Sequence, residues 1–435
     1  MEEVPPGRIQ NITKDQELRL KQVWAHLFQY WGVPVDVSHV LTKDGAGDNP
    51  SVRSVSSGQK KKRLGVFHRK RTGSNSSDQN RGHRLSSVSV STTRSQESIE
   101  SKYLHSLLHN SLEDLDPKEV REKFWRMLRC DYPDNLLLRF VRARKWDIDK
   151  AMAMIAHTLR WRLKENRPDE IILGGEAAMY KEGRPGLIKQ LELGKATVRG
   201  FDKNGHPIVY VRPKLHHSSD QTEQDVQEYS LLIIELARLF LREPQDSATI
   251  IFDMTGFSMS NMDYAPVKFL ITCFEAHYPE CLSKLFIHKA PWIFPPIWNI
   301  IKNWLDPVVA SKIVFTKSLT DLEQYVPMQY IAKDLGGEDD YNYDGFVLPD
   351  PSVDEKLQDE EAKAAILQER DNIIEQFIQS TVNWIESATD EDSEKWLRRK
   401  IELSKELSAN YSRLDPYIRS RSFYDVNGTL KVSSE

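Results

Sequence analysis

Cysteine is scarce in this chain, and no apolar run is long enough to cross a membrane. The 435 residues include three cysteines, Cys130, Cys273 and Cys281. Their spacing matches neither a zinc motif nor a disulfide framework, which favours a reducing compartment. The most apolar stretch, 286–301, is interrupted by three prolines, a histidine and a lysine, and the first ten residues have no apolar signal core. We therefore expect a cytoplasmic protein whose membrane contact is peripheral.

The sequence also lacks the motifs of common phosphate-binding and hydrolytic enzymes. No glycine-rich phosphate loop precedes an expected helix, and no nucleophile elbow follows an expected strand. Asp253 ends an expected strand, where α/β enzymes keep acids, but no partner motif accompanies it. His216 and His217, with Asp220 nearby, have no third ligand at a recognisable spacing, so we expect no metal site. The protein is predicted not to be an enzyme.

Charge is distributed unevenly along the chain. Residues 43–100 hold 12 basic and 5 acidic residues, a net charge of +7, whereas the whole chain carries −4 and the remainder therefore −11. This window is rich in serine and nearly free of aromatic residues, which predicts a disordered linker. Its basic stretch 60–71 is expected to attract anionic membrane rather than nucleic acid, because interleaved aromatic residues are missing. Ser86, Ser87 and Ser95 are candidate phosphorylation sites; a solvated charge run without function is the alternative.

Residues 1–42, ahead of the linker, are expected to contain one helix over 15–31. Thr13 and Gln16 form a capping-box pattern in front of it. Apolar residues recur in it at helical spacing: Leu20, Val23, Trp24, Leu27 and Trp31. A single helix has no core of its own, so we expect it to dock on the main body, with a partner-binding helix as the alternative.

Residues 101–175 are expected to form a helical N-lobe, in which the segment 134–146 is the most informative. On a helical wheel its apolar side chains form one stripe. Arg144 falls within that stripe, whereas Arg139 and Arg142 fall on the opposite side. An arginine in an apolar stripe is costly unless it is paired. Arg144 is therefore predicted to point inward, with a snorkelling arginine at the stripe's end as the alternative.

Residues 176–345 show strands alternating with helices. Strands are expected over 196–201, 207–212, 248–253, 285–288 and 313–316, and helices over 221–242, 263–277 and 297–305. Asn204-Gly205 is a strong hairpin signal between the first two strands. The pattern predicts an α/β fold with a mixed, mainly parallel sheet. Residues 346–435 are expected to add a helical extension that points to no chemistry.

The helix expected over 297–305 is apolar around most of its circumference. Its polar residues share one narrow face, and a helix of this kind is buried on two sides or faces lipid. We interpret this region as a movable lid, with an ordinary core helix as the alternative. The lid residues are Trp292, Phe294, Ile297, Trp298, Ile301, Trp304 and Leu305. Lys312 follows the lid and precedes a strand, which suggests that the enclosed molecule is apolar with an anionic head.

Six short motifs in a fixed order connect this chain to a known family. They occupy 138–146, 253–258, 278–280, 290–292, 305–313 and 335–337. Together they resemble the CRAL-TRIO lipid-binding family, and in particular its fungal phosphatidylinositol-transfer homologues, over residues 117–337. The resemblance implies a helical N-lobe beside an α/β lobe, a sheet floor and a helical lid over a deep apolar pocket, with extra helices at both ends. It also implies exchange of one lipid at a time, without covalent chemistry or a cofactor.

The resemblance further implies which residues hold the phosphatidylinositol head group. These are Arg144, Glu280, Val309 and Lys312. Glu280 would be the carboxylate partner of the inward-pointing Arg144, and Lys312 would bind the phosphate. Val309 stands where the family has a threonine, so one hydrogen bond to the phosphate is missing.

The expected pocket wall departs from homologues that carry phosphatidylcholine. Those homologues have hydroxyl residues on the central strand and tyrosines near the hairpin, whereas the corresponding residues here are Val198, Val209, Ala248, Ile250 and Phe252. A buried phosphate without hydroxyl donors would leave acceptors unsatisfied, at about 1–3 kcal/mol each. We therefore expect poor binding of phosphatidylcholine and a possible second, apolar cargo with little or no head group.

Three functional hypotheses follow from this reading. The first is binding of phosphatidylinositol and its intermembrane transfer or presentation, on endomembranes such as the endoplasmic reticulum, endosomes or lipid droplets. The second is a lipid sensor or scaffold that regulates a lipid-modifying enzyme without bulk transfer. The third is an adaptor with a vestigial pocket.

Overall fold

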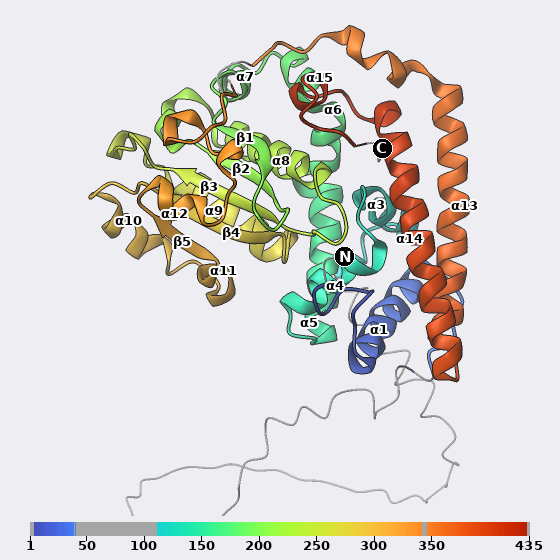
Figure 1. Ribbon diagram of the computed structural model, residues 1–435. Coiled ribbons are helices and arrows are strands. Elements are labelled where there is room, and N and C mark those ends of the chain that lie inside the picture. Colours follow the sequence, from blue (N-terminus) through green and yellow to red (C-terminus); the bar gives the residue numbers. More distant parts are fainter. Residues whose placement is uncertain (1–3, 39, 41–110, 342–345, 433–435) are drawn as a thin grey trace, which may run out of the picture.

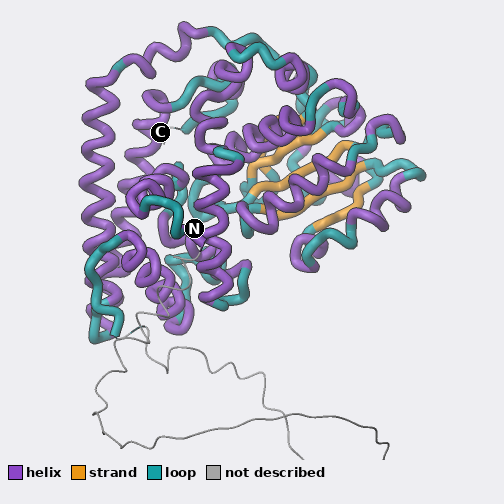
Figure 2. Tube along the Cα trace, turned by 180° about the vertical axis from the view of Figure 1, so that it is seen from behind, coloured by secondary structure: helices purple, strands orange, loops and turns teal. Residues whose placement is uncertain are grey.

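The computed structural model describes residues 4–38, 40, 111–341 and 346–432. The linker expected over 43–100, with its basic stretch, lies outside the described residues. The chain forms an α/β lobe, which contains the sheet and α7–α12, and a helical lobe, which contains α1, α3–α6, α13 and α14 (Figure 1). Figure 2 shows the strands gathered on one side of the molecule and helices making up the other.

One five-stranded sheet forms the centre of the α/β lobe, in the order β1-β2-β3-β4-β5. The strands are β1 Ala196–Phe201, β2 Pro207–Val211, β3 Ala248–Asp253, β4 Leu282–His288 and β5 Ile313–Thr316. β1 and β2 are antiparallel, and the other neighbouring strands are parallel. Gly205 has φ +81° in the turn between β1 and β2, a backbone conformation that glycine adopts without strain. The predicted α/β fold, with a mainly parallel sheet opened by a hairpin, is confirmed.

Helices account for most of the remaining chain. Their bounds are α1 Lys14–Trp31, α3 Pro117–Met127, α4 Pro133–Ala143, α5 Ile148–Arg160, α6 Pro168–Lys181, α7 Pro185–Glu192, α8 Glu223–Leu239, α9 Tyr264–Thr272, α10 Phe294–Ile301, α11 Pro307–Ser311, α12 Leu319–Glu323, α13 Glu360–Ile385, α14 Asp390–Ile418 and α15 Phe423–Val426. Single π-helical turns extend α5 and α9. The lid helix is shorter than expected, because α10 ends at Ile301 and a turn leads from it to α11.

The two faces of the sheet pack against different partners. Strand side chains alternate between the faces, and Tyr210, Ile251 and Phe286 point to the face covered by α12 and the turns that follow it. Val209 and Ile250 point to the opposite face, on the side of α8. This second face forms the floor of the cavity described below.

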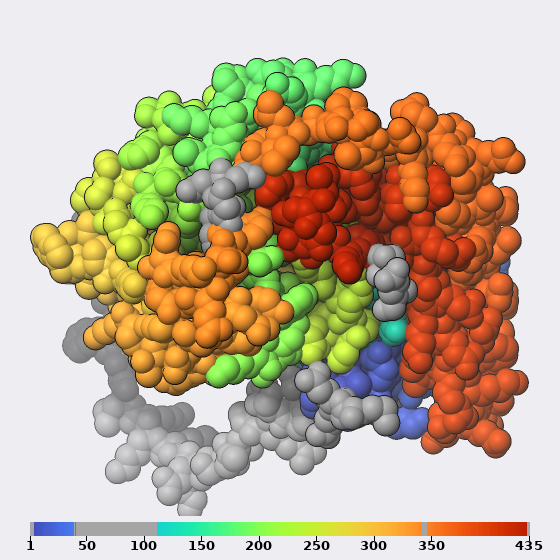
Figure 3. All heavy atoms as spheres, turned by 45° about the horizontal axis from the view of Figure 1, so that its top comes forward, coloured from blue at the N-terminus to red at the C-terminus, as the bar shows by residue number. Residues whose placement is uncertain are grey.

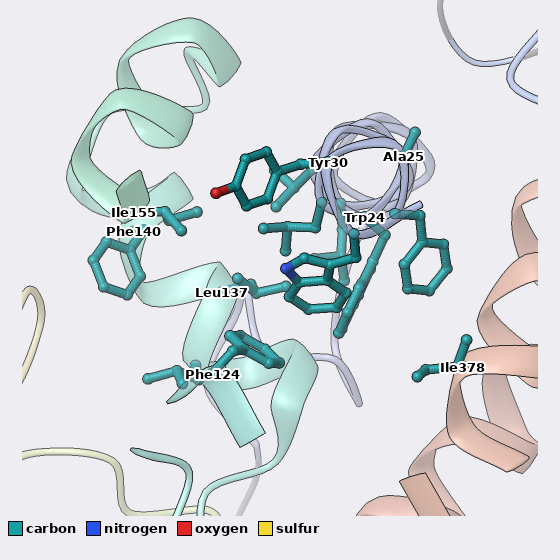
Figure 4. Close-up of a cluster of buried hydrophobic side chains, with 14 of the residues drawn as sticks. Trp24, Ala25, Tyr30, Phe124, Leu137, Phe140, Ile155 and Ile378 are labelled. Atoms are coloured by element: carbon teal, nitrogen blue, oxygen red, sulfur yellow. The ribbon is translucent and has the colours of Figure 1, made fainter. Parts of the chain in front are cut away.

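The expected docking of the N-terminal helix is confirmed. Trp24 of α1 lies in one core cluster with residues of α3, α4, α5 and the C-terminal pair α13 and α14. Figure 4 shows its indole pointing toward Phe124 and Leu137. The indole N–H donates to Oδ1 of Asp134 at 2.7 Å, and the Lys400 ammonium of α14 lies 2.8 Å from the same oxygen. The chain ends are therefore joined to each other through the N-lobe.

Buried ion pairs correct the helical-wheel assignment of the arginines on α4. Arg139, expected on the side opposite the apolar stripe, is 1% exposed and pairs with Asp131 at 2.7 Å. Arg142 pairs with Asp246 at 3.1 Å. The wheel assumed one solvent-facing side, but every residue from 133 to 141 is buried. One side of α4 packs against other helices of the helical lobe, and the other side faces the α/β lobe. Arg144 follows the last residue of the helix and is only half-buried.

The last described residues pack against the first strand of the sheet. The Tyr424 hydroxyl accepts the backbone N–H of Val198 at 3.1 Å, and Leu430 and Val432 share its core cluster. In Figure 3 the C-terminal residues, in red, fill the face between the α/β lobe and the C-terminal helices. The extension expected over 346–435 thus packs on both lobes, while the expected domain boundaries themselves stay predictions.

The Lys400–Asp134 ion pair allows a test of how α1 and α14 are held against the N-lobe. Lys400 is fully buried, its ammonium lies 3.8 Å from the ring centroid of Trp384, and burial lowers its pKa to about 8. Replacing Lys400 with Met leaves the Asp134 carboxylate buried without its cation, so we expect a loss of about 3–5 kcal/mol in the free energy of unfolding. Urea titration measures it, with the exposed Lys405→Met as the control. Adding Asp134→Asn should restore part of the loss; full stability of Lys400→Met would contradict this account.

Candidate lipid-binding site

An apolar cavity of about 310 Å³ lies over the β2–β4 face of the sheet. Residues of α8, α9 and α10 form its remaining walls. In Figure 1, α9 and α10 belong to the end of the molecule farthest from α13 and α14. The wall is mostly aliphatic and aromatic, and its central side chains include Ile233, Leu270, Phe274, Leu285, Ile287 and Ile313. A cavity of this composition accommodates hydrocarbon rather than a polar metabolite.

Four of the five expected pocket-lining residues line this cavity. They are Val209, Ala248, Ile250 and Phe252. Alternation along β2 and β3 brings them to one face. Val198 is the exception: it is fully buried, but in the core cluster that includes Tyr424. The C-terminal segment covers β1 at this residue, since the backbone N–H of Val198 donates to the Tyr424 hydroxyl.

The lid residues divide into two groups. Five of them line the cavity: Phe294, Ile297, Trp298, Ile301 and Leu305. Trp304 instead packs on α9, with its ring centroid 5.5 Å from that of Tyr264 and 4.8 Å from the Lys268 ammonium. Trp292 precedes α10 and is 90% exposed. These two tryptophans therefore have environments different from that of the five residues in the cavity wall. Trp292 precedes α10, and Trp304 follows the turn after Ile301.

Little other structure covers the two helices that form this wall. No residue of α9 is fully buried, and Ile300 of α10 is 45% exposed. A polar contact joins the turn after α9 to the start of α11, since the backbone N–H of Asp306 donates to Oε1 of Glu275 at 2.6 Å. A thin apolar wall with few fixed contacts is the kind of segment that can open at low cost in free energy.

Three of the four expected head-group residues lie at or beside one end of the cavity, which we call the lysine end. The Lys312 ammonium lies 3.9 Å from Oε2 of Glu280 and donates to the carbonyl oxygen of Leu282 at 2.7 Å. The side chains of Lys312 and Glu280 are 25% and 27% exposed. Neither belongs to the cavity wall, but Leu282 and Ile313 next to them do. Val309 contributes to the cavity wall itself.

Arg144, the fourth expected head-group residue, makes a different contact. Its guanidinium donates to the backbone carbonyl oxygen of Glu275, at 3.4 Å. Among the contacts of the described residues, Glu280 pairs with Lys312 and not with Arg144. Arg144 was predicted to point inward. In the structure it is half-buried and contacts the backbone beside the lid.

The opposite end of the cavity, which we call the hairpin end, carries polar residues that the sequence reasoning missed. Gln190, Lys195, Arg212 and His216 line it. Nε2 of His216 lies 3.2 Å from Oδ2 of Asp263, and burial lowers the pKa of this imidazole. The motif at 216–220 had been considered only as a metal site, and the described residues contain no cluster of three potential metal ligands. The sequence did contain a signal for this end of the cavity, because the basic residues Lys195 and Arg212 flank the two strands of the expected hairpin.

None of the described helices has the length and apolar character required to cross a bilayer.

Comparison with known proteins agrees with the fold and the cavity. Residues 191–337 match the family described as the CRAL/TRIO domain, and residues 106–157 match its N-terminal domain. A protein of Eremothecium gossypii named "Phosphatidylinositol transfer protein CSR1" is 61% identical over 98% of this chain and 99% of its own length. A CRAL-TRIO domain-containing protein of Schizosaccharomyces pombe is 38% identical over 98% of this chain and 92% of its own. The chain belongs to the CRAL/TRIO family.

A solved structure of Sfh5 is also similar to this chain. It is 19% identical, covers 48% of this chain and 72% of its own, and superposes with a TM-score of 0.39.

The contact between Trp304 and α9 makes a prediction about the lid. Trp304→Ala removes an edge-to-face aromatic pair worth about 1 kcal/mol, so we expect roughly fivefold faster local opening. Hydrogen exchange of the backbone amides in 294–311 measures this opening. The control is Trp292→Ala, which removes a tryptophan that is exposed in the closed form. Equal exchange rates in the two variants would show that Trp304 does not hold the lid.

Proposed function

We propose that the protein binds phosphatidylinositol in this cavity and transfers it between membranes. The observation that carries the proposal is an apolar cavity with a thin, half-exposed wall and a paired cation and carboxylate beside one end of it. The name of the relative matched over its whole length supports the same cargo and favours transfer over a sensor without bulk transfer. Binding and exchange of this kind need no covalent step.

The lysine end offers complementary groups for an inositol phosphate head. The Lys312 ammonium is a compact charge suited to a phosphate, and the Glu280 carboxylate can accept hydrogen bonds from inositol hydroxyls. On binding, Lys312 would exchange part of its contact with Glu280 and the Leu282 carbonyl for the phosphate. Arg144, beside Glu275, is a further candidate for the same head group. Val309 supplies only apolar contact.

The floor of the cavity supports selection against phosphatidylcholine. Ala248 and Ile250 present methyl groups to the cavity, so a choline phosphate lying on this strand would find no hydroxyl donor there. The same wall suits a second cargo with almost no head group. A transfer assay that includes phosphatidylcholine tests the selection, because robust transfer of that lipid would contradict it.

Lys312→Ala tests the head-group assignment. Lys312 is the basic residue among Lys312, Glu280 and Val309 at the lysine end. Its loss should lower phosphatidylinositol transfer between vesicles at least tenfold, the factor that corresponds to about 1.4 kcal/mol. The change should leave stability nearly intact, since a partly exposed ion pair contributes about 0–1 kcal/mol. Lys317→Ala, an exposed lysine beyond the other end of β5, makes the same charge change away from the cavity. Full transfer by Lys312→Ala would refute the assignment.

The basic stretch 60–71 is proposed to tether the protein peripherally to anionic endomembranes. Its seven lysines and arginines could each add about 1 kcal/mol near such a surface. Deleting residues 43–100 should weaken binding to anionic vesicles, and the difference from the full chain should shrink as salt concentration rises. Phosphorylation of Ser86, Ser87 or Ser95 would act in the same direction. Unaltered binding across salt concentrations would rule out the tether.

A further inference from the structure

The hairpin end lies diagonally across the sheet from the lysine end. Arg212 donates its backbone N–H to the carbonyl oxygen of Lys195 at 2.8 Å, and the two residues flank the pair Ala196–Val211. They are thus at the edge where the parallel strands end, whereas Lys312 lies where they begin. The six residues of β3 separate these edges by about 16 Å at ~3.3 Å per residue. The three strand spacings from β2 to β5 add about 14 Å sideways.

Lys195 is a buried cation in the cavity wall. It is 6% exposed, and its ammonium donates to Oε1 of Gln221 at 2.7 Å. An ammonium has three N–H donors, and this contact uses one of them, on a neutral amide. Burial lowers the pKa of Lys195 to about 8, so the side chain is still mostly protonated at neutral pH.

The carboxylates around Lys195 are engaged with other partners, two of them cations and one the His216 imidazole. Asp220 lies 2.9 Å from the Lys189 ammonium, Asp225 pairs with Arg184, and Asp263 pairs with His216. Among the described residues, no carboxylate lies within 4.0 Å of the Lys195 ammonium. A buried charge without an opposite charge is costly, and an anion held in the cavity would remove that cost.

A second cation at the same end is held in a fixed orientation. Arg212 is one of the residues that line the cavity, and its guanidinium donates to the carbonyl oxygens of Leu193 and Gly194, each at 3.0 Å. These bonds fix the plane of the guanidinium beside the hairpin. From this end toward the lid, the wall is apolar: Val209, Ile233, Ile250, Phe252 and Phe274.

We propose that the hairpin end binds the carboxylate of a fatty acid, with Lys195 as the contacting cation, Arg212 as its neighbour, and the acyl chain along the apolar floor. A carboxylate on a single chain is the smallest anionic group that a hydrocarbon ligand can bring to the inner end of this cavity. The ammonium can donate its two remaining N–H groups to the carboxylate, and such charge-assisted bonds are stronger than bonds between neutral groups.

This site makes the fatty acid a competitor of phosphatidylinositol. The two head groups would occupy opposite ends, but both ligands would place hydrocarbon against Ile250 and Phe252. Occupancy is therefore exclusive, and a fatty acid would displace the phospholipid. The competition rests on the proposed function, whereas binding of the fatty acid itself does not.

The test compares oleate with oleyl alcohol, which has the same chain and no charge. Both are titrated against the full-length, delipidated protein carrying a fluorescent fatty acid. We expect oleate to bind at least tenfold more tightly, and Lys195→Met to remove that preference while oleyl alcohol binding is unchanged. Lys189→Met, which removes a neighbouring lysine outside the cavity, should keep the preference. Equal affinity of the two ligands for the native protein, or no binding of either, would overturn the proposal.

The same variants separate this inference from the proposed function. Phosphatidylinositol transfer by Lys195→Met should be insensitive to added oleate when compared with the same variant without oleate, and Lys312→Ala should lose transfer yet still prefer oleate to the alcohol. If Lys195 only links the hairpin to α8 through Gln221, Lys195→Met will lower the thermal unfolding temperature and leave the oleate preference intact, which contradicts the proposal. If Lys195→Met does not fold, the ligand preference of the native protein and of Lys195→Arg decides the question.

Discussion

The α10 helix separates an apolar cavity from water, and it carries apolar side chains on both of its sides. Trp298 lines the cavity while Ile300 is exposed, so the helix forms a wall one layer thick. Exposing the cavity lining to water would cost about 25 cal/mol for each Å² of apolar surface. The cavity is therefore stable only while the wall is closed or while a bilayer replaces water on its open side. This constraint accounts for the few fixed contacts of α9, α10 and α11.

The rest of the molecule gives this thin wall a rigid support. A network of buried arginines and carboxylates, with Glu235 at its centre, connects the two lobes: Arg162 and Arg238 both pair with it, and the Tyr278 hydroxyl donates to it at 2.8 Å. The C-terminal segment adds a second connection by covering β1 through Tyr424. We propose that opening is confined to the lid, because the floor and the back of the cavity are fixed by these buried interactions.

Sequence patterns predicted the α/β lobe well, because its signals are local. Strand β3 was predicted to the residue at 248–253, and the hairpin followed from Asn204-Gly205. Patterns that depend on tertiary neighbours were predicted poorly. Arg139 was placed on a solvent side that α4 does not have, since both of its sides are buried.

The candidate site shows the same division. Lys312, Glu280 and Val309 follow short motifs and lie together at the lysine end, whereas Arg144 contacts a backbone carbonyl near the lid. The hairpin end was not predicted, because Lys195 and Arg212 are brought together by strand pairing and their burial depends on α7 and α8. The contact of Val198 with Tyr424 was not predicted for a related reason: the two residues are more than half the chain apart in sequence.

The identity of the retained lipid tests the central claim most directly. The delipidated full-length protein is incubated with vesicles that contain equal amounts of phosphatidylinositol and phosphatidylcholine, then separated from them and extracted for mass spectrometry. This account predicts close to one phosphatidylinositol per protein chain and little phosphatidylcholine. Retention of the two lipids in equal amounts, or of neither, would contradict it.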